Sequence, residues 1–396
     1  MTSLKDARIL LYSHDTFGLG HLRRCRAIAH ALVEAYSGLQ VLIISGAPIA
    51  GAFDYRARVD FVKVPSVIKL RNGEYTSLAE HVDLSDTLKM RRSIILETAR
   101  SFAPDVLIVD KEPMGLHGEI EETLAVLKGM GTRLVLGLRE VMDSPELLAA
   151  EWSRKKLMPR VDQYFDDIWV YGPRGFHDPL MGLEVPAPVH DRMRYVGFLK
   201  RTSYGIEPRP VDEPYILVTP GGGGDGAEMI RDVIAAYRHA PDLPQRAVIV
   251  LGPYMPAEQR AELRKLACRH DKLEVMDFSP RMEDLMANAA AVICMSGYNT
   301  WCEVLSFDKP ALILPRTEPR EEQLIRARRA TDLNAATMLM PEQSCDPAVM
   351  ADAIRALGRQ LPPSVGYPHP DLDGLENIIR IMGEWLAPKR VGAVAV

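Results

Sequence analysis

Short apolar segments alternate with longer segments of helical periodicity through the first half of the chain. The apolar segments cover residues 7–13, 39–45, 105–110, 132–138 and 167–172. Apolar runs of this length are typical of strands that are buried on both faces of a parallel sheet. Helix-length segments, such as residues 22–36 and 118–129, lie between these runs. The alternation therefore predicts a doubly wound α/β sheet with right-handed crossovers.

The same pattern starts again in the second half, after a stretch with little apolar periodicity. Strand candidates there are residues 214–219, 246–252, 272–278, 291–296 and 310–315, and helix candidates are residues 227–239, 256–268, 298–306 and 320–331. One hydrophobic core rarely serves 396 residues, so we predict two Rossmann-like domains, 1–198 and 199–370. Residues 371–396 should add a helix, amphipathic over 375–386, and a tail that can pack back on the first domain.

The composition narrows the possible functions. A net charge of −5 argues against a nucleic-acid partner, which usually requires a basic excess. The 5 cysteines include no CxxC pair, so we expect reduced thiols, no disulfide framework and no zinc site. No run approaches ~20 apolar residues, and the N-terminus lacks the features of a signal peptide. We therefore expect a cytoplasmic protein, in which residues 88–102 form either a peripheral membrane contact or, equally well, a core helix.

Polar chemistry gathers in the turn after the first strand, at residues 13–24. Gly18 and Gly20 allow a tight turn and a close approach of the backbone to a ligand. His21 falls at the start of the next helix, where the helix dipole favours a neutral imidazole that can act as a general base, with Asp15 to orient it. The GxGxxR pattern differs from the GxGxxG fingerprint, so NAD is not favoured. The alternative is that the glycines only close the turn and His21 caps the helix.

A run of glycines follows the first strand of the second half, within the segment TPGGGGDGA at residues 219–227. Each glycine costs conformational entropy on folding, which favours a loop whose backbone N–H groups approach a phosphate at a helix N-terminus. The candidate residues are Gly222, Gly223, Gly224 and Gly226. The segment lacks the GKS or GKT of a P-loop, which argues against a kinase or ATPase. A loop without a ligand is the alternative.

A second helix start in this half, at residues 295–303, carries polar residues suited to a nucleoside. Glu303 lies about one turn into the helix, on the same face as Asn299 or Thr300. A carboxylate in this place can accept hydrogen bonds from the vicinal hydroxyls of a ribose. In isolation, a solvated helix glutamate would be the simpler interpretation.

A third helix start, at residues 315–327, follows the last predicted strand. Its side chains Glu322 and Gln323 could hydrogen-bond sugar hydroxyls. Arg316 could offset the negative charge of a phosphate, although a run of charged residues more often forms the solvent-exposed face of a helix.

Charged residues also follow strands of the first domain and should face the same cleft. These acceptor-side or phosphate-binding candidates are Arg24, Asp110, Arg139 and Asp143. Pairing of Arg139 with Asp143 would be an alternative without any ligand.

Residues 214–340 resemble the nucleotide-binding domain of the N-acetylglucosaminyltransferases that complete lipid II in peptidoglycan synthesis, because several motifs recur in order. The matching residues are the phosphate loop at 222–227, the uracil-reading segment Phe278–Ser279, the ribose-binding residues Ser296, Gly297 and Glu303, and the sugar-binding pair Glu322 and Gln323. The resemblance implies the GT-B architecture, in which two Rossmann-like domains face a central cleft, and a UDP-linked donor.

The turn at residues 18–24 departs from that family, which has a longer GGxGGH motif. It instead resembles the GxGHxxR motif of the nucleotide-sugar hydrolase of pseudaminic acid synthesis, whose matching histidine is implicated in activating water. The chain as a whole resembles bacterial proteins labelled predicted glycosyltransferases.

We therefore expect a metal-independent, inverting glycosyltransferase without a cofactor, in which His21 removes a proton from the acceptor. The acceptor stays open, and a lipid-linked molecule or a polysaccharide is among the options. Nucleotide-sugar hydrolysis, 2-epimerisation and non-catalytic binding of a nucleotide-sugar are the alternatives.

Overall fold

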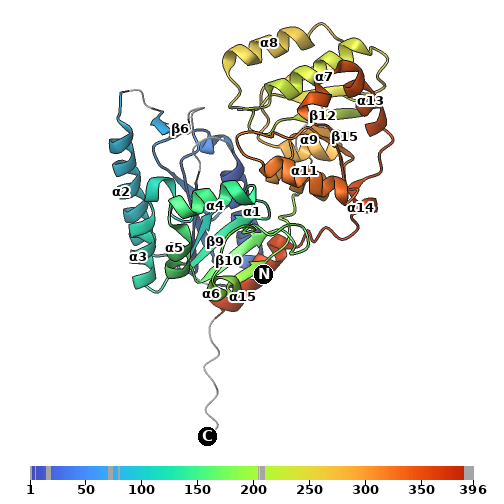
Figure 1. Ribbon diagram of the computed structural model, residues 1–396. Coiled ribbons are helices and arrows are strands. Elements are labelled where there is room, and N and C mark those ends of the chain that lie inside the picture. The colour runs from blue at the N-terminus through green and yellow to red at the C-terminus, as the bar shows by residue number, and fades with distance from the viewer. Residues whose placement is uncertain are drawn as a thin grey trace.

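The computed structural model divides the chain into two parallel-sheet α/β lobes (Figure 1). It describes residues 2–4, 6–14, 19–69, 75–78, 81–203, 205 and 210–387.

The first lobe is built on a parallel sheet. Its strands are β1 Thr2–Ser3, β2 Arg8–Ser13, β3 Tyr36–Ser37, β4 Gln40–Ser45, β5 Val59–Lys63, β6 Val67–Lys69, β7 Tyr75–Ser77, β8 Val106–Asp110, β9 Arg133–Arg139, β10 Asp167–Tyr171 and β11 Met193–Tyr195. Its helices are α1 Gly20–Ala35, α2 Leu84–Phe102, α3 Glu121–Gly129, α4 Pro145–Arg154, α5 Leu157–Tyr164 and α6 Ala187–Asp191, with 3-10 turns at Ala50–Ala52 and Leu116–Gly118. Within the described residues, seven strands form the main sheet in the order β11-β10-β9-β8-β2-β4-β5. The order reverses between β2 and β8, and ligands of open α/β sheets bind beyond the strand ends at such a switch point.

The second lobe repeats this plan. Its strands are β12 Tyr215–Thr219, β13 Arg246–Val250, β14 Leu273–Met276, β15 Ala291–Cys294, β16 Ala311–Ile313 and β17 Thr337–Met338. Its helices are α7 Ala227–His239, α8 Ala257–Ala267, α9 Met282–Asn288, α10 Tyr298–Ser306, α11 Glu322–Asp332, α12 Pro341–Ser344, α13 Pro347–Leu357 and α14 Pro363–Gly366. The described strands pair in the order β14-β13-β12-β15-β16-β17, so the switch point lies between β12 and β15.

The predicted doubly wound architecture is confirmed in both halves. Every apolar run named above forms a strand, because residues buried on both faces leave a continuous apolar signal. The missed strands are short or lie at a sheet edge: β5, β11 and β17 end their sheets, and β6 and β7 form a separate hairpin. Residues 194–195, which begin the stretch of little apolar periodicity that we interpreted as a linker, pair with β10 as part of β11 instead.

The last helix, α15 at Gly374–Leu386, packs on the first lobe, although it follows the second in sequence (Figure 1). Tyr36 donates a hydrogen bond to the Ile379 carbonyl at 2.7 Å, and Trp385 stacks on Trp169. The chain passes from the first lobe to the second near Phe198 and returns to the first lobe near Asp371. These two segments lie side by side, because Phe198 N–H donates a hydrogen bond to the Asp371 carbonyl at 2.8 Å. Two adjacent segments therefore connect the lobes.

The candidate membrane segment at residues 88–102 lies within α2 and turns its apolar side inward. Ile95 is buried, and Arg91 forms a buried ion pair with Glu119 at 2.6 Å. Core packing therefore explains this segment. Among the described residues, no helix combines the length and apolar character needed to cross a bilayer.

Candidate active site

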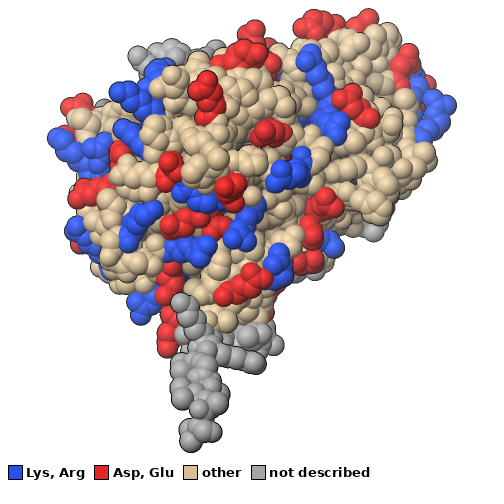
Figure 2. Space-filling model, turned by 60° about the horizontal axis from the view of Figure 1, so that its bottom comes forward, with Lys and Arg blue, Asp and Glu red and all other residues tan. Residues whose placement is uncertain are grey.

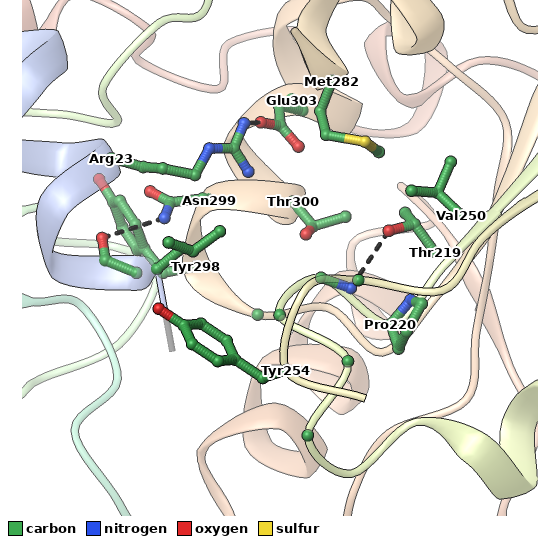
Figure 3. Close-up of a pocket in the computed structure, with 18 of the residues that line it drawn as sticks. Arg23, Thr219, Pro220, Val250, Tyr254, Met282, Tyr298, Asn299, Thr300 and Glu303 are labelled. Carbon is green, nitrogen blue, oxygen red and sulfur yellow. Dashed lines mark hydrogen bonds and ion pairs between the residues drawn. The ribbon is translucent and has the colours of Figure 1, made fainter. Parts of the chain in front are cut away.

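A first cavity of about 300 Å³ lies between the lobes, beyond the carboxyl ends of both sheets. Its walls include the start of α1, the glycine loop, the start of α10 and the start of α11. Figure 3 shows Arg23, Asn299, Thr300 and Glu303 around this space, opposite Thr219. The starts of α1 and α10 and the glycine loop each follow a strand that borders a switch point, and Asp110 is the last residue of such a strand, β8. The topology therefore brings these predicted motifs together.

A second cavity of about 880 Å³ opens on the side of the first lobe. It contains His14, His21, Lys111 and Glu112, none of which lines the first cavity. The residues shared by the two cavities are Gly20, Arg24, Arg139, Arg316 and Glu322. Two molecules bound in these spaces would therefore meet beside the start of α1.

His21 is held by a buried carboxylate at this junction. The Nδ1 atom of His21 lies 2.6 Å from Asp110 Oδ2, and the imidazole keeps 18% of its surface exposed. Arg24 donates to both Asp110 oxygens, at 3.0 and 2.6 Å. Arg24 and His21 lower the pKa of Asp110 well below its ordinary value against the opposing effect of burial, so the carboxylate is charged and accepts a hydrogen bond from Nδ1–H of His21. Nε2 of His21 is then the basic nitrogen.

Asp110, and not Asp15, is thus the described partner of His21. The prediction placed Asp110 on the acceptor wall, but the structure places it beneath His21 and outside both cavity linings. Ser13 and Asp110 are aligned in neighbouring strands, and this register sets the pairing. Asp15 and Gly18 lie outside the described residues.

His14 is a neighbour of His21 that the sequence interpretation did not use. Its ring contacts the His21 ring edge-on, with centroids 5.6 Å apart. Burial lowers the pKa of His14 to about 3, so it is neutral at physiological pH. A neutral His14 places no fixed positive charge beside His21.

The glycine loop has packing reasons for two of its glycines. A Cβ on Gly223 would lie 2.3 Å from the Leu251 carbonyl oxygen, and one on Gly226 would lie 1.9 Å from a side-chain carbon of Pro220. Gly226 lies outside the cavity lining, whereas residues 221–225 line it. Close backbone packing therefore accounts for part of the glycine content that we had attributed to phosphate binding.

Glu303 lines the first cavity and is paired with a residue of the other lobe. Arg23 of α1 contacts Glu303 (Figure 3). It also contacts Glu283, at 2.9 Å. Burial raises the pKa of the Glu303 carboxyl, and Arg23 opposes that effect. The sequence did not show that Arg23 crosses the cleft, because its partners lie 260 and 280 residues away.

The amide of Asn299 also bridges the lobes. Its Nδ2 donates to the Gly20 carbonyl at 3.1 Å, and its Oδ1 accepts from Arg201 at 2.7 Å. Asn299 and Thr300 both line the first cavity, and so does Gly297, the N-cap of α10. Ser296 is fully buried behind this wall and outside the lining, with its carbonyl held by Arg326 at 2.9 Å, so the predicted direct contact with a donor is not supported for its side chain.

Glu322, at the start of α11, pairs with Arg139 across the cleft. Arg139, Lys111 and Arg316 outweigh burial and hold the pKa of Glu322 well below its ordinary value. Arg316 pairs with Asp225 of the glycine loop at 2.5 Å, and its backbone N–H donates to Gln323 at 3.0 Å. The positive charge of Arg316 is therefore next to the loop proposed to bind phosphate.

Arg139 and Asp143 do not pair with each other. Asp143 is buried outside both cavity linings, where it accepts from Arg320 at 2.9 Å and from the Glu321 backbone at 2.9 Å. It fixes the loop after β9 to the loop before α11, so its predicted contact with an acceptor is not supported.

Aromatic and apolar residues line another part of the first cavity. Phe278 packs edge-on against Phe53, with ring centroids 6.0 Å apart, and Ser279 and Met282 lie on the same wall. Tyr254 is a further lining residue (Figure 3). The sequence singled out Phe278 and Ser279 but missed Phe53, because a lone aromatic residue in the other half carries no local signal.

Comparisons with known proteins agree with this architecture. Residues 215–360 match the model of the glycosyltransferase family 28 C-terminal domain. The chain is 23% identical over 386 residues to an uncharacterized glycosyltransferase of the archaeon Methanosarcina acetivorans, with 94% of each chain covered. It is 29% identical over 148 residues to the UDP-N-acetylglucosamine--N-acetylmuramyl-(pentapeptide) pyrophosphoryl-undecaprenol N-acetylglucosamine transferase of Fusobacterium nucleatum, covering 37% of this chain and 38% of that one.

Among solved structures, MurG of Acinetobacter baumannii superposes with a TM-score of 0.57 at 13% identity, covering 96% of this chain and 99% of that one. This likeness shows the shared GT-B fold. Residues 215–360 therefore resemble the glycosyltransferase family 28 C-terminal domain, and the chain is a glycosyltransferase with the GT-B fold.

Proposed function

We propose that the protein transfers a sugar from a UDP-linked donor to an acceptor hydroxyl with inversion at the anomeric carbon. The observation that carries this proposal is the His21–Asp110 pair at the junction of the two cavities. The first cavity takes the donor, and the second takes the acceptor.

The first cavity suits a nucleoside diphosphate in several respects. The glycine loop precedes α7, and the starts of α1, α10 and α11 also border the cavity, so several helix dipoles favour a diphosphate there. Arg316 adds a positive charge, Glu303 can accept hydrogen bonds from ribose hydroxyls, and the wall with Phe278 is suited to a nucleobase. These groups are of the kind that can stabilise a departing diphosphate without a metal or cofactor.

The reaction is a single displacement. Nε2 of His21 removes the acceptor proton while the acceptor oxygen forms a bond to the anomeric carbon. The bond from that carbon to the diphosphate breaks, and its electron pair leaves with UDP. Asp110 holds the imidazole and stabilises its protonated form.

The test uses labelled UDP-sugars with and without a small-molecule cell extract as a source of acceptor. Extract-dependent release of UDP supports transfer, and His21→Ala and His21→Asn should each lower it about 10²–10⁴-fold with UDP affinity near wild type. His30→Asn, on the same helix but outside both cavities, is the matched control.

Other outcomes would replace the proposal. Rapid release of free sugar without extract would indicate a hydrolase, and a mixture of epimers would indicate a 2-epimerase. UDP binding with no turnover under any condition would indicate a binding protein. We also propose a cytoplasmic location, where nucleotide-sugars are available, and fractionation of cells would test it.

A further inference from the structure

Basic side chains outnumber acidic ones around the second cavity. Seven Lys or Arg side chains line it, against three Glu side chains. The basic residues are Arg24, Lys111, Arg139, Arg154, Lys155, Arg316 and Arg320, and the acidic ones are Glu112, Glu151 and Glu322. The whole chain carries −5, and on the face in Figure 2 both signs of charge intermingle. The positive surplus is therefore a local feature of this cavity.

Most of these cations are already paired closely with carboxylates. Arg24 pairs with Asp110, Arg139 with Glu322, Arg316 with Asp225, Arg320 with Asp143 and Glu151, and Lys155 with Glu151. Two cations differ. Arg154 has no ion pair among the described residues, but it is exposed to solvent. Lys111 is largely buried, and its closest ion-pair partner among the described residues is Glu112 at 3.7 Å, beyond hydrogen-bonding distance. Its ammonium group therefore retains hydrogen-bonding capacity for a ligand in the cavity.

The backbone at Lys111 has an uncommon conformation. Its φ is 72°, in the left-handed region that a lysine rarely adopts. Its N–H donates to the Gly137 carbonyl at 2.8 Å, and the neighbouring Asp110 is fixed by His21 and Arg24. Such conformations persist where the surrounding structure holds them, and they cluster at functional sites.

The surroundings of Lys111 disfavour its positive charge. Its side chain is 17% exposed, and its pKa is lowered to about 8, chiefly by burial. Arg139 and Arg320 contribute to this lowering, while Glu112 and Glu322 oppose it. A bound anion would offset the free-energy cost of burying this positive charge.

We propose that the acceptor carries an oxyanion group, a phosphate ester or a carboxylate, that binds Lys111 in the second cavity. Lys111 directly follows Asp110, the partner of His21, so one small molecule can place its anion at Lys111 and its reacting hydroxyl at Nε2. This inference rests on the proposed function, because it names the acceptor class of the same site.

The test is calorimetric titration of the full-length protein with inorganic phosphate and, separately, with acetate, each with and without saturating UDP. We expect at least one anion to bind in the presence of UDP. Tighter binding of phosphate would indicate a phosphate ester on the acceptor, and tighter binding of acetate would indicate a carboxylate. Lys111→Met should weaken that binding about 10-fold or more, and Lys111→Arg should weaken it less. Lys265→Met, on the exposed face of α8 and outside both cavities, should bind like wild type.

Two results would overturn the inference: no anion binding with UDP present, or binding that Lys111→Met leaves unchanged. Failure of the proposed function would look different, because it would appear in the UDP-sugar assay, as free sugar, a mixture of epimers or no turnover, and not in the anion titration. Anion binding that depends on Lys111 without UDP binding would support the anion site and reject the donor assignment.

Discussion

The carboxylate of Asp110 interacts with two basic side chains, and this shared contact determines how His21 can act. One oxygen faces both His21 and Arg24, and the other accepts from Arg24 alone. Asp110 is outside the cavity linings, so it acts on a substrate only through His21 and is a positioning residue.

Asp110→Asn should lower turnover at least about 10²-fold while UDP affinity stays near wild type, because the amide cannot stabilise the protonated imidazole. In the double variant with His21→Ala, the two losses should not add, since Asp110 acts only through His21. Single-turnover rates check this, and additive losses would show that Asp110 acts independently of His21.

Lys111, the proposed anion-binding residue, should lower the stability of the folded chain. Its pKa is about 8 in the folded chain and 10.5 in the reference state, so folding disfavours its charged form. The charged Lys111 therefore destabilises the folded chain, and this effect is largest below about pH 8. It decreases as the pH rises toward 10.5, where the unfolded chain also loses the charge.

Lys111→Met should therefore raise the free energy of unfolding at pH 7 by roughly 1–3 kcal/mol. This gain should shrink as the pH approaches 10.5. Urea unfolding at a series of pH values measures the difference, and a gain that stays constant with pH would rule out the charge as its cause.

At the scale of elements, the start of α1 reaches across the cleft to α10. Arg23 contacts Glu303 and Asn299 contacts the first residue of α1, so the proposed ribose carboxylate also takes part in domain contact. Binding of a ribose would exchange the ion pair for hydrogen bonds to hydroxyl groups.

Comparison of UDP with 2′-deoxy-UDP isolates the role of Glu303. Wild type should prefer UDP, because the deoxy ligand lacks a hydrogen bond to a charged group that contributes about 1.5–3 kcal/mol. Glu303→Ala should lose this preference, whereas Glu283→Gln, which also contacts Arg23 but lies outside the first cavity, should keep it. Calorimetry with both ligands decides, and an undiminished preference in Glu303→Ala would exclude the ribose contact.

At the scale of the whole molecule, a fully buried ion pair joins the two lobes. Glu140, after β9, accepts from Arg326 of α11 at 2.5 Å, and neither side chain is exposed. Removing one partner of such a pair leaves an uncompensated buried charge.

Glu140→Gln should therefore lower the stability of the protein by about 3–5 kcal/mol. Asp242→Asn, which removes an exposed pair with Arg355 inside the second lobe, should change it by less than about 1 kcal/mol. Urea unfolding with probes in each lobe measures both effects. Equal, small effects of the two substitutions would mean that the buried pair contributes little to joining the lobes.

The sequence by itself determined the two α/β domains and placed most of the polar motifs after the correct strands. Buried parallel strands leave unbroken apolar runs, and helix starts after them carry recognisable glycine and polar residues. This local information, together with the family resemblance of residues 214–340, was enough to select His21, the glycine loop, Glu303 and Glu322 as candidates.

Only the tertiary structure decided which charged groups meet. Arg23 and Glu303 are 280 residues apart, and Arg24 and Asp110 are 86 apart, so their pairing depends on how sheets and lobes align. The same alignment buries Ser296 and Asp143, isolates Lys111 from a close carboxylate, and joins the two cavities beside His21. Periodicity along a chain records which residues are buried within an element, but not which distant residue each one contacts.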